Sequence, residues 1–270
     1  MRDFRADQAD LFDRVADRYD ERVPFFRTLG RQLVEWADLG QDDAVLDIGA
    51  GRGAVSLAAL EQMAESGTVQ AIDVSPRMVA LVNALGVPRL FATQMDAHVL
   101  CFEDNRFDMT LAGFVFTLLR DQTAVMAEVH RVLKPGASLC VSIPGPSEVD
   151  GGWWERYGEI YADFQTRLGV TVEPHTDDKD EPWEELAMRA GLCLVDERSV
   201  PTEVPLGDPG EHWDWLMSHG NSWLYDALEP GDAEQFRGAV MRSFVTHHPT
   251  GGRSIIVAPV FLRFTKTDIS

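Results

Sequence analysis

Residues 45–53 read Val-Leu-Asp-Ile-Gly-Ala-Gly-Arg-Gly, and this stretch decides the fold. Its first four residues are mainly apolar, as in a strand buried within a parallel sheet. The three glycines that follow allow a sharp turn and let the backbone approach a ligand closely. Residues 54–61 are good helix formers, and the free N–H groups at the start of that helix would face the same crevice. A strand, a glycine loop and a helix in this order predict a site for a nucleotide-type cofactor.

This stretch alone fits two cofactors. The spacing of Gly49, Gly51 and Ala54 also matches the dinucleotide fingerprint, and Asp73 lies near the distance expected for an acid that binds ribose. S-adenosylmethionine (SAM), which donates a methyl group, and NAD, which exchanges a hydride, are therefore both candidates at this point.

The composition narrows the class of protein. Of the 270 residues, 45% are hydrophobic and 25% are charged, which is ordinary for a globular enzyme with one sizeable core. The net charge of −20 opposes binding to phosphates, so we expect no nucleic-acid partner. We find no signal segment at the start and no apolar run long enough to span a membrane. The three cysteines have neither metal nor disulfide spacing, so we expect free thiols, a cytoplasmic location and no bound metal.

Strands and helices alternate along the first half of the chain. Residues 7–38 predict two helices broken at Pro24. Further strands are expected at 68–74, 90–94, 107–116 and 138–143, and further helices at 77–85 and 122–133. This alternation predicts an α/β fold with a parallel sheet that is covered on both faces.

The composition changes after Pro144, where six of the seven tryptophans lie. Helices are expected at 153–168, 181–190 and 209–245, the last with breaks at Gly220 and Pro230, and single strands at 192–204 and 254–265. These two strands would complete a seven-stranded sheet, with the residues between them forming a lid over the crevice. We therefore expect an N-terminal helical segment (1–40), a cofactor-binding core (41–145), and a final part (146–270) that holds the lid, the substrate-binding insertions and the last strands.

Five motifs follow one another along the first half of the chain. They are Phe12–Asp20 with its pattern Phe-Asp-x-Val-Ala-x-x-Tyr-Asp, the glycine motif at 45–53, Ala71–Met78, Asp96–Asp108 and Arg131–Gly136. With these five motifs in this order, the chain resembles the class I SAM-dependent methyltransferases. Within that family it resembles the branch of ubiquinone, menaquinone and small-molecule (secondary-metabolite) methyltransferases. The resemblance implies a Rossmann-like, mostly parallel sheet, SAM as cofactor and S-adenosylhomocysteine (SAH) as product. A nicotinamide enzyme has no reason to carry the last two motifs, so the resemblance favours SAM over NAD.

The same resemblance implies how the methionine part of SAM is held. The backbone of the glycine loop would approach it at Gly49, Ala50 and Gly51. Asp47 would orient this loop, either through the ammonium of the cofactor or by capping the N–H groups of the loop. Tyr19 would reach over the cofactor toward its carboxylate, and Phe114 would line the pocket near the sulfur.

A second group of residues would hold the nucleoside part of SAM. Asp73 ends its strand where two carboxylate oxygens can accept hydrogen bonds from both ribose hydroxyls, with Val74 beside it. Met78 resembles the residue that packs on adenine. Asp96 would accept a hydrogen bond from the adenine amino group, next to the backbone of Ala97.

The chemistry leaves the need for a base open. Methyl transfer is a direct displacement at a sulfonium carbon, and alignment supplies much of its rate. A base is needed only if the acceptor must lose a proton. Relatives often carry one or two histidines where this chain has Thr117 and Leu118, and their absence removes a ready acid or base there. The candidate catalytic groups are Tyr19, His212 and His219, and the two histidines could share one helix face with Trp215.

The tryptophans of the second half are the main indication of the substrate class. An aromatic pocket for an apolar or planar small molecule would draw on Trp153, Trp154, Trp213, Trp215 and Trp223. The methyl group would go to an O, N or C atom of a natural product or a quinone-like molecule. As an alternative, the same fold can act as a cyclase or as a SAM-binding subunit without transfer activity. Protein or RNA methylation is opposed by the acidic charge, and the sequence leaves open whether the chain forms a homo-oligomer.

Overall fold

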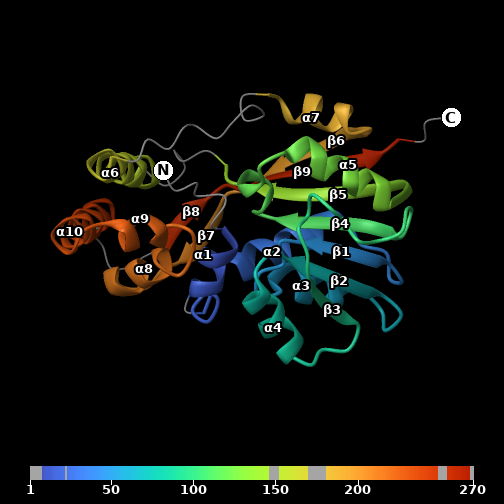
Figure 1. Cartoon of the computed structure of the whole chain (residues 1–270), viewed down its shortest axis with the longest axis horizontal. Coiled ribbons are helices and arrows are strands. Elements are labelled where there is room, and N and C mark those ends of the chain that lie inside the picture. Colours follow the sequence, from blue (N-terminus) through green and yellow to red (C-terminus); the bar gives the residue numbers. More distant parts are fainter. Residues whose placement is uncertain (1–7, 22, 146–151, 170–180, 249–253, 268–270) are drawn as a thin grey trace.

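The structure, a computed structural model, describes residues 8–21, 23–145, 152–169, 181–248 and 254–267 (Figure 1). Its main sheet has the strand order β3 (Leu90–Gln94), β2 (Thr68–Asp73), β1 (Ala44–Ile48), β4 (Phe107–Gly113), β5 (Leu133–Ile143), β9 (Val260–Lys266) and β6 (Leu192–Ser199). Neighbouring strands from β3 to β5 run parallel, whereas β9 runs antiparallel to both β5 and β6. The predicted α/β fold with a mostly parallel, seven-stranded sheet is confirmed.

Three neighbouring strands end at the same edge of this sheet. In the register of β1, Asp47 lies opposite Ala71 of β2 and Leu111 of β4, each close to the carboxyl end of its strand. The loops that follow β1, β2 and β4 therefore leave the sheet side by side. The strand order reverses at β1, and open α/β sheets bind their ligands in the crevice at such a switch point.

Helices cover both faces of the sheet. The helices on one face are α2 (Phe25–Ala37), α3 (Ala54–Gln62) and α4 (Pro76–Ala84), and those on the other are α5 (Gln122–Val132) and α7 (Trp183–Arg189). Alternate residues of β1 point to opposite faces, so Val45 joins the α2–α4 core and Leu46 joins the α5–α7 core. Asp47 shares the face of Val45, which directs its side chain toward α3.

All helices of the second half except α7 gather beside one end of the sheet, on the left in Figure 1. This layer, called the lid layer below after the lid expected from the sequence, consists of α6 (Trp153–Arg167), α8 (Pro209–Leu216), α9 (Ser222–Ala227) and α10 (Pro230–His247), with β7 (Thr202–Pro205) and β8 (Ser254–Val257). The layer has its own aromatic-rich core, which Phe25 and Leu29 of α2 join. Helix α2 therefore ties the layer to the sheet. No helix in the described ranges is long and apolar enough to cross a membrane.

Two predicted strands are each divided in the structure. Residues 192–204 form β6 and β7 with Pro201 between them, and residues 254–265 form β8 and β9 with Pro259 at the break. Proline has no N–H group to contribute to a sheet, so the chain leaves the ladder there. Strands β7 and β8 pair with each other in a separate antiparallel sheet, and only β6 and β9 complete the main one.

Strand β5 begins earlier than the sequence indicates. The sequence predicts a helix at 122–133 and a strand at 138–143, with Lys134-Pro135-Gly136 between them. Instead α5 ends at Val132, and Leu133 already pairs with Phe107 of β4, with a shift of register before Ser138 meets Met109. Lys134-Pro135-Gly136 therefore lies within β5, in the irregular part of the strand, and does not separate it from the helix.

Candidate functional site

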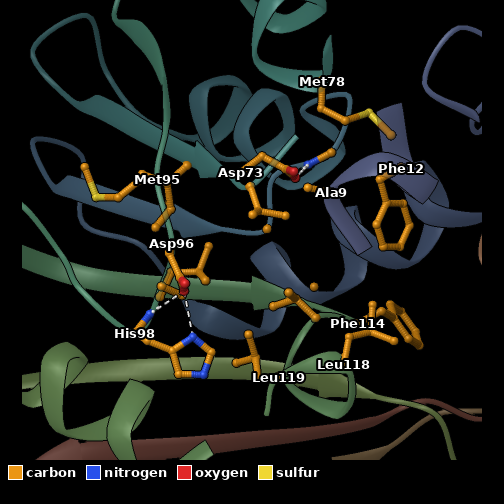
Figure 2. Close-up of a pocket in the computed structure, with 18 of the residues that line it drawn as sticks. Ala9, Phe12, Asp73, Met78, Met95, Asp96, His98, Phe114, Leu118 and Leu119 are labelled. Carbon is orange, nitrogen blue, oxygen red and sulfur yellow. Dashed lines mark hydrogen bonds and ion pairs between the residues drawn. The ribbon is translucent and has the colours of Figure 1, made fainter. Parts of the chain in front are cut away.

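A cavity of about 570 Å³ opens at the carboxyl edge where β1, β2 and β4 end (Figure 2). Its walls come from the ends of these three strands, from the loop after β3, and from the N-terminal segment with Phe12 and Tyr19. Figure 2 shows Asp73 and Met78 at one part of the cavity and Asp96 with His98 at another. Volumes of 300–1,000 Å³ are typical of small-molecule sites, at about the scale of this cavity.

The glycine loop requires residues without side chains at two points. Gly49 has a φ of +66°, and a Cβ there would lie 2.5 Å from the side chain of Val115. Gly51 has a φ of +52°, where a Cβ would point toward the ring of Tyr19 at 3.6 Å. Both conformations are left-handed and therefore strained for other residues. At Gly49 and Gly51 the loop consequently lines the cavity with backbone atoms alone, and Gly51 faces the ring of Tyr19.

Asp73 holds the glycine loop and the start of α4 together. One carboxylate oxygen accepts a hydrogen bond from the backbone N–H of Gly51 at 2.8 Å, and the other accepts from the N–H of Ser75 at 2.9 Å. Burial raises the pKa of this carboxyl, and these backbone hydrogen bonds act against that rise. Each oxygen of an ionised carboxylate keeps a second acceptor site, and Asp73 lines the cavity. The group can therefore accept from two neighbouring hydroxyls of a ligand, as a ribose would require.

A second acidic group lies after β3. Asp96 accepts hydrogen bonds from the backbone N–H of His98 at 2.9 Å and from its Nδ1 at 2.6 Å. Partial burial acts to raise the pKa of Asp96, but these bonds from His98 outweigh it and lower the pKa. The Nε2 of His98 accepts from the backbone N–H of Asp121 at 3.4 Å, which orients the imidazole. Asp96 is thus an ionised hydrogen-bond acceptor at the cavity, and His98 holds its carboxylate in place.

Asp47 is buried behind the glycine loop. One oxygen accepts a hydrogen bond from the hydroxyl of Ser56 on α3 at 2.5 Å, while the other has no hydrogen-bond partner among the described residues. Burial raises the pKa of Asp47 to about 7, against the lowering effect of the side chain and backbone of Ser56. Asp47 therefore joins β1 to the first turn of α3, and it does not line the cavity.

Tyr19 and Phe114 stand where the first cavity meets a second one of about 540 Å³. The ring of Tyr19 stacks on that of Phe26 at 5.0 Å, and its backbone carbonyl accepts from Arg52 at 3.0 Å. Phe114 adopts a φ of +58°, which is rare for a bulky side chain, and its N–H donates to the carbonyl of Ser142 at 2.9 Å. Both cavities share the side chains of Phe12, Tyr19, Phe114 and Leu118.

The second cavity is lined mainly by aromatic and apolar groups. They come from α2, α6 and α8, from the turn between α8 and α9, and from the turn between β8 and β9. They include Phe25, Phe26, Trp154, Tyr161, Trp215 and His219. The Nδ1–H of His219 donates to the carbonyl of Trp215 at 2.7 Å, and its Nε2 accepts from the amide of Asn221 at 3.2 Å. Desolvation lowers the pKa of His219 to about 4, against the raising effect of the Trp215 carbonyl, so the imidazole is neutral at physiological pH.

The chain is similar in sequence to known methyltransferases. Residues 46–141 match the family model of the methyltransferase domain. The chain is 27% identical to nocamycin O-methyltransferase of Saccharothrix syringae, over 93% of this chain and 95% of that protein. It is 28% identical to a demethylmenaquinone methyltransferase of Lactobacillus johnsonii, over 63% of this chain and 74% of the relative. The domain at residues 46–141 and these relatives support a class I SAM-dependent methyltransferase.

The fold of this methyltransferase also recurs in solved structures. A Bacillus halodurans protein described as a methyltransferase matches it with a TM-score of 0.58 and 18% identity, over 89% of this chain and 99% of that one. At this level of identity the match concerns the fold alone.

The residues present in the first cavity of the methyltransferase fit SAM. The bare glycine loop, the two anchored carboxylates and the apolar side chains between them offer groups for its methionine, ribose and adenine parts. All predicted cofactor residues except Asp47 and Ala50 line this cavity, namely Tyr19, Gly49, Gly51, Asp73, Val74, Met78, Asp96, Ala97 and Phe114. The N–H of Ala50 donates to the carbonyl of Ile72 at 3.0 Å, which holds the loop against β2.

The structure separates the predicted acceptor residues into two groups. Trp154, Trp215 and His219 line the second cavity of the methyltransferase, whereas Trp153, Trp213, Trp223 and His212 are absent from its lining. His212 is fully buried and stacks on Phe244 at 3.9 Å, and burial lowers its pKa to about 3. Trp153 and Trp213 are likewise buried in the core of the lid layer.

Several lining residues were missed by the sequence reasoning. Phe25, Phe26 and Tyr161 line the second cavity, and Asp121 lines the first. Two phenylalanines directly after Pro24 indicate that large aromatic side chains pack at the start of α2. Nothing in the sequence pattern shows that the first turn of α2 faces the lid layer.

Proposed function

We propose that this methyltransferase moves the methyl group of SAM, held in the first cavity, onto a planar, apolar small molecule held in the second. The wall that the two cavities share carries this proposal. Phe12, Tyr19, Phe114 and Leu118 contribute to both linings, so two ligands would meet there over a short distance. Direct displacement needs such a meeting, because the two reacting atoms must lie in line and in contact.

The residues of the first cavity would divide the work of holding the donor. The glycine loop would hold the methionine part, Asp73 the two ribose hydroxyls, and Asp96 the adenine amino group, with Met78 against the ring. When bound there, SAM supplies a methyl group on a positively charged sulfur. Phe114, fixed by its backbone bond to Ser142, would bound the space in which the acceptor approaches that group.

The lining of the second cavity supports an apolar acceptor. Aromatic side chains such as Phe26, Trp154 and Trp215 offer flat surfaces on which a planar molecule can stack. The relatives compared above are named for nocamycin and demethylmenaquinone, both small molecules. The net charge of −20 disfavours a nucleic-acid substrate, and the three free thiols fit a reducing compartment, so we propose that the reaction runs in the cytoplasm.

The division of the chain follows the same scheme. We propose that residues 41–145 bind the donor, while residues 1–40 and 146–270 enclose the acceptor. The described parts of both flanking segments contribute to the second cavity, through Tyr19 and Phe26 on one side and Trp154 and His219 on the other.

Calorimetry with SAM, SAH and NAD tests the first half of the proposal. We expect SAM and SAH to bind and NAD not to bind; a folded protein that bound neither SAM nor SAH would refute it. Incubation with SAM and a panel of planar acceptors, followed by product mass, then tests the second half. A mass gain of one methyl group is the expected result.

A matched pair of tryptophan variants tests the acceptor site. Trp154 lines the second cavity, whereas Trp223 packs against the same lid core outside the lining. We expect Trp154→Leu to raise the KM for a planar acceptor about tenfold, since a stacked aromatic pair is worth about 1 kcal/mol beyond its area and some apolar area is lost as well. Trp223→Leu should leave KM nearly unchanged. Equal effects of the two substitutions would show that the acceptor binds elsewhere.

A further inference from the structure

His219 is the one imidazole among the described residues that line the second cavity. Its ring is held on both nitrogens. Because a carbonyl oxygen only accepts hydrogen bonds, the 2.7 Å contact with Trp215 places the ring proton on Nδ1. The Nε2 therefore carries a lone pair, and Asn221 donates to it at 3.2 Å. The imidazole is thus fixed in the tautomer that can accept a proton at Nε2.

His219 also lies close to the wall between the two cavities. The ring of Phe26 contacts the imidazole edge to face at 5.9 Å, and the same ring stacks on Tyr19 at 5.0 Å and meets Phe114 at 5.9 Å. One aromatic ring therefore separates His219 from residues that line the donor cavity. A hydroxyl of an acceptor held at this wall would have Nε2 of His219 on one side and the donor on the other.

The groups that surround His219 carry no charge at neutral pH. None of the described residues that line the second cavity is Asp, Glu, Lys or Arg. The phenols Tyr19 and Tyr161 have their pKa raised by burial. His212 lies on α8, seven residues before His219, and is neutral because burial lowers its pKa to about 3. An acceptor that entered as an anion would find no cation among these groups and would lose its hydration. A neutral acceptor does not meet this cost.

We propose that Nε2 of His219 is the general base for a planar acceptor that enters uncharged and reacts through an aromatic or enolic hydroxyl. This inference rests on the proposed function and names the reacting group of its substrate. The hydroxyl would replace the amide of Asn221 as the hydrogen-bond donor to Nε2.

The step balances without a further reactant. The O–H bond of the acceptor breaks and its proton passes to Nε2. The oxygen electron pair forms the bond to the methyl carbon, while the carbon–sulfur bond breaks and its electrons remain on sulfur. A methyl ether, SAH and an imidazolium result, and the imidazolium releases its proton to water as the products leave. A low pKa of His219 keeps the base unprotonated between turnovers.

Two naphthols and two variants test this assignment. The acceptor probes are 1-naphthol, which has an ordinary phenolic pKa of about 10, and 4-nitro-1-naphthol, whose hydroxyl is much more acidic. We expect His219→Ala and His219→Gln to lower kcat for 1-naphthol by about 100-fold or more, which is the usual contribution of a general base. The loss with 4-nitro-1-naphthol should be several-fold only, because that hydroxyl needs less help to ionise. Free imidazole should restore part of the kcat of His219→Ala.

A second histidine, His247, serves as a control that distinguishes a catalytic role of His219 from a structural one. The Nδ1 of His247 on α10 lies 2.8 Å from the carbonyl four residues earlier, Ser243, in the same local arrangement as His219, but His247 does not line the cavity. His247→Gln should leave kcat for both naphthols unchanged. The affinity for SAM, measured by calorimetry, should be the same in all variants, which shows that the donor site is intact.

Three results would overturn the inference. The first is a His219 variant that methylates 1-naphthol at nearly the wild-type rate, or loses equal activity on both naphthols. The second is faster methylation of 1-naphthoate or 1-naphthylamine than of the naphthols by the wild type. The third is 4-nitro-1-naphthol bound in the presence of SAH with the absorbance of its ionised form. A wild type that binds no SAM, or methylates none of the probes, would instead refute the donor site or the acceptor class proposed above.

Discussion

Asp73→Asn is the sharpest perturbation of the donor site because it changes one atom. In the structure the two carboxylate oxygens each accept one backbone N–H, from Gly51 at 2.8 Å and Ser75 at 2.9 Å. An asparagine can satisfy only one of these donors with its oxygen, and its amide NH₂ would meet the other N–H. The substitution therefore disturbs the glycine loop and also removes the charged acceptor for the ribose hydroxyls.

The expected loss follows from those contacts. A hydrogen bond to a charged group contributes about 1.5–3 kcal/mol, and two such bonds to ribose would be lost or weakened. We expect SAM binding to weaken by at least about 3 kcal/mol, which is a factor of more than 100 in Kd. SAH should lose affinity equally, because it carries the same ribose.

Calorimetry with SAM and SAH measures both losses, and thermal unfolding without ligand shows whether the variant remains folded. Asp121→Asn is the matched control: Asp121 also lines the first cavity, and its carboxylate accepts the N–H of Ala124 at the start of α5. Asparagine caps helices as well as aspartate does, so this variant should bind SAM within about threefold of the wild type. If Asp73→Asn bound SAM as tightly as the control, the ribose assignment would be wrong.

Two further variants test the charges around the cavity. Asp47 has an ordinary pKa near 3.8 when unfolded and a pKa of about 7 when buried, so the folded state binds more protons between these values and the free energy of unfolding falls as pH rises from about 4 to 7. Asp47→Asn should therefore be more stable than the wild type at about pH 8, by at most about 4 kcal/mol, with the difference vanishing near pH 4 in urea unfolding; equal stability at both pH values would contradict this. His98 donates to Asp96, so His98→Ala should weaken SAM binding several-fold in calorimetry with little change in kcat, and an unchanged Kd would show that Asp96 needs no such support.

Much of the donor site was predictable because it is local in sequence. A strand end, a glycine loop and the first turn of a helix lie within a few residues of one another, and their geometry follows from backbone rules that the sequence displays directly. The spacing after the glycine loop and the resemblance to the methyltransferases indicated Asp73, whereas the resemblance alone indicated Asp96. In the structure both residues line the first cavity. Asp47 shows the limit of this reasoning. Its place in the motif predicted that it would orient the glycine loop. In the structure its side chain points to Ser56, because the alternation of side chains along β1 turns it toward α3.

The acceptor site depends on contacts between distant segments, which composition does not reveal. The sequence by itself determined the alternating α/β fold, the cofactor loop and the enrichment of tryptophan in the second half. Only the tertiary structure decided that Trp154, Trp215 and His219 line a cavity, whereas the buried Trp153, Trp213 and His212 do not. The physical reason is that an aromatic side chain is equally suited to a core and to a binding wall. Which of these it becomes depends on how α2 and the lid helices pack, through contacts that no local pattern encodes.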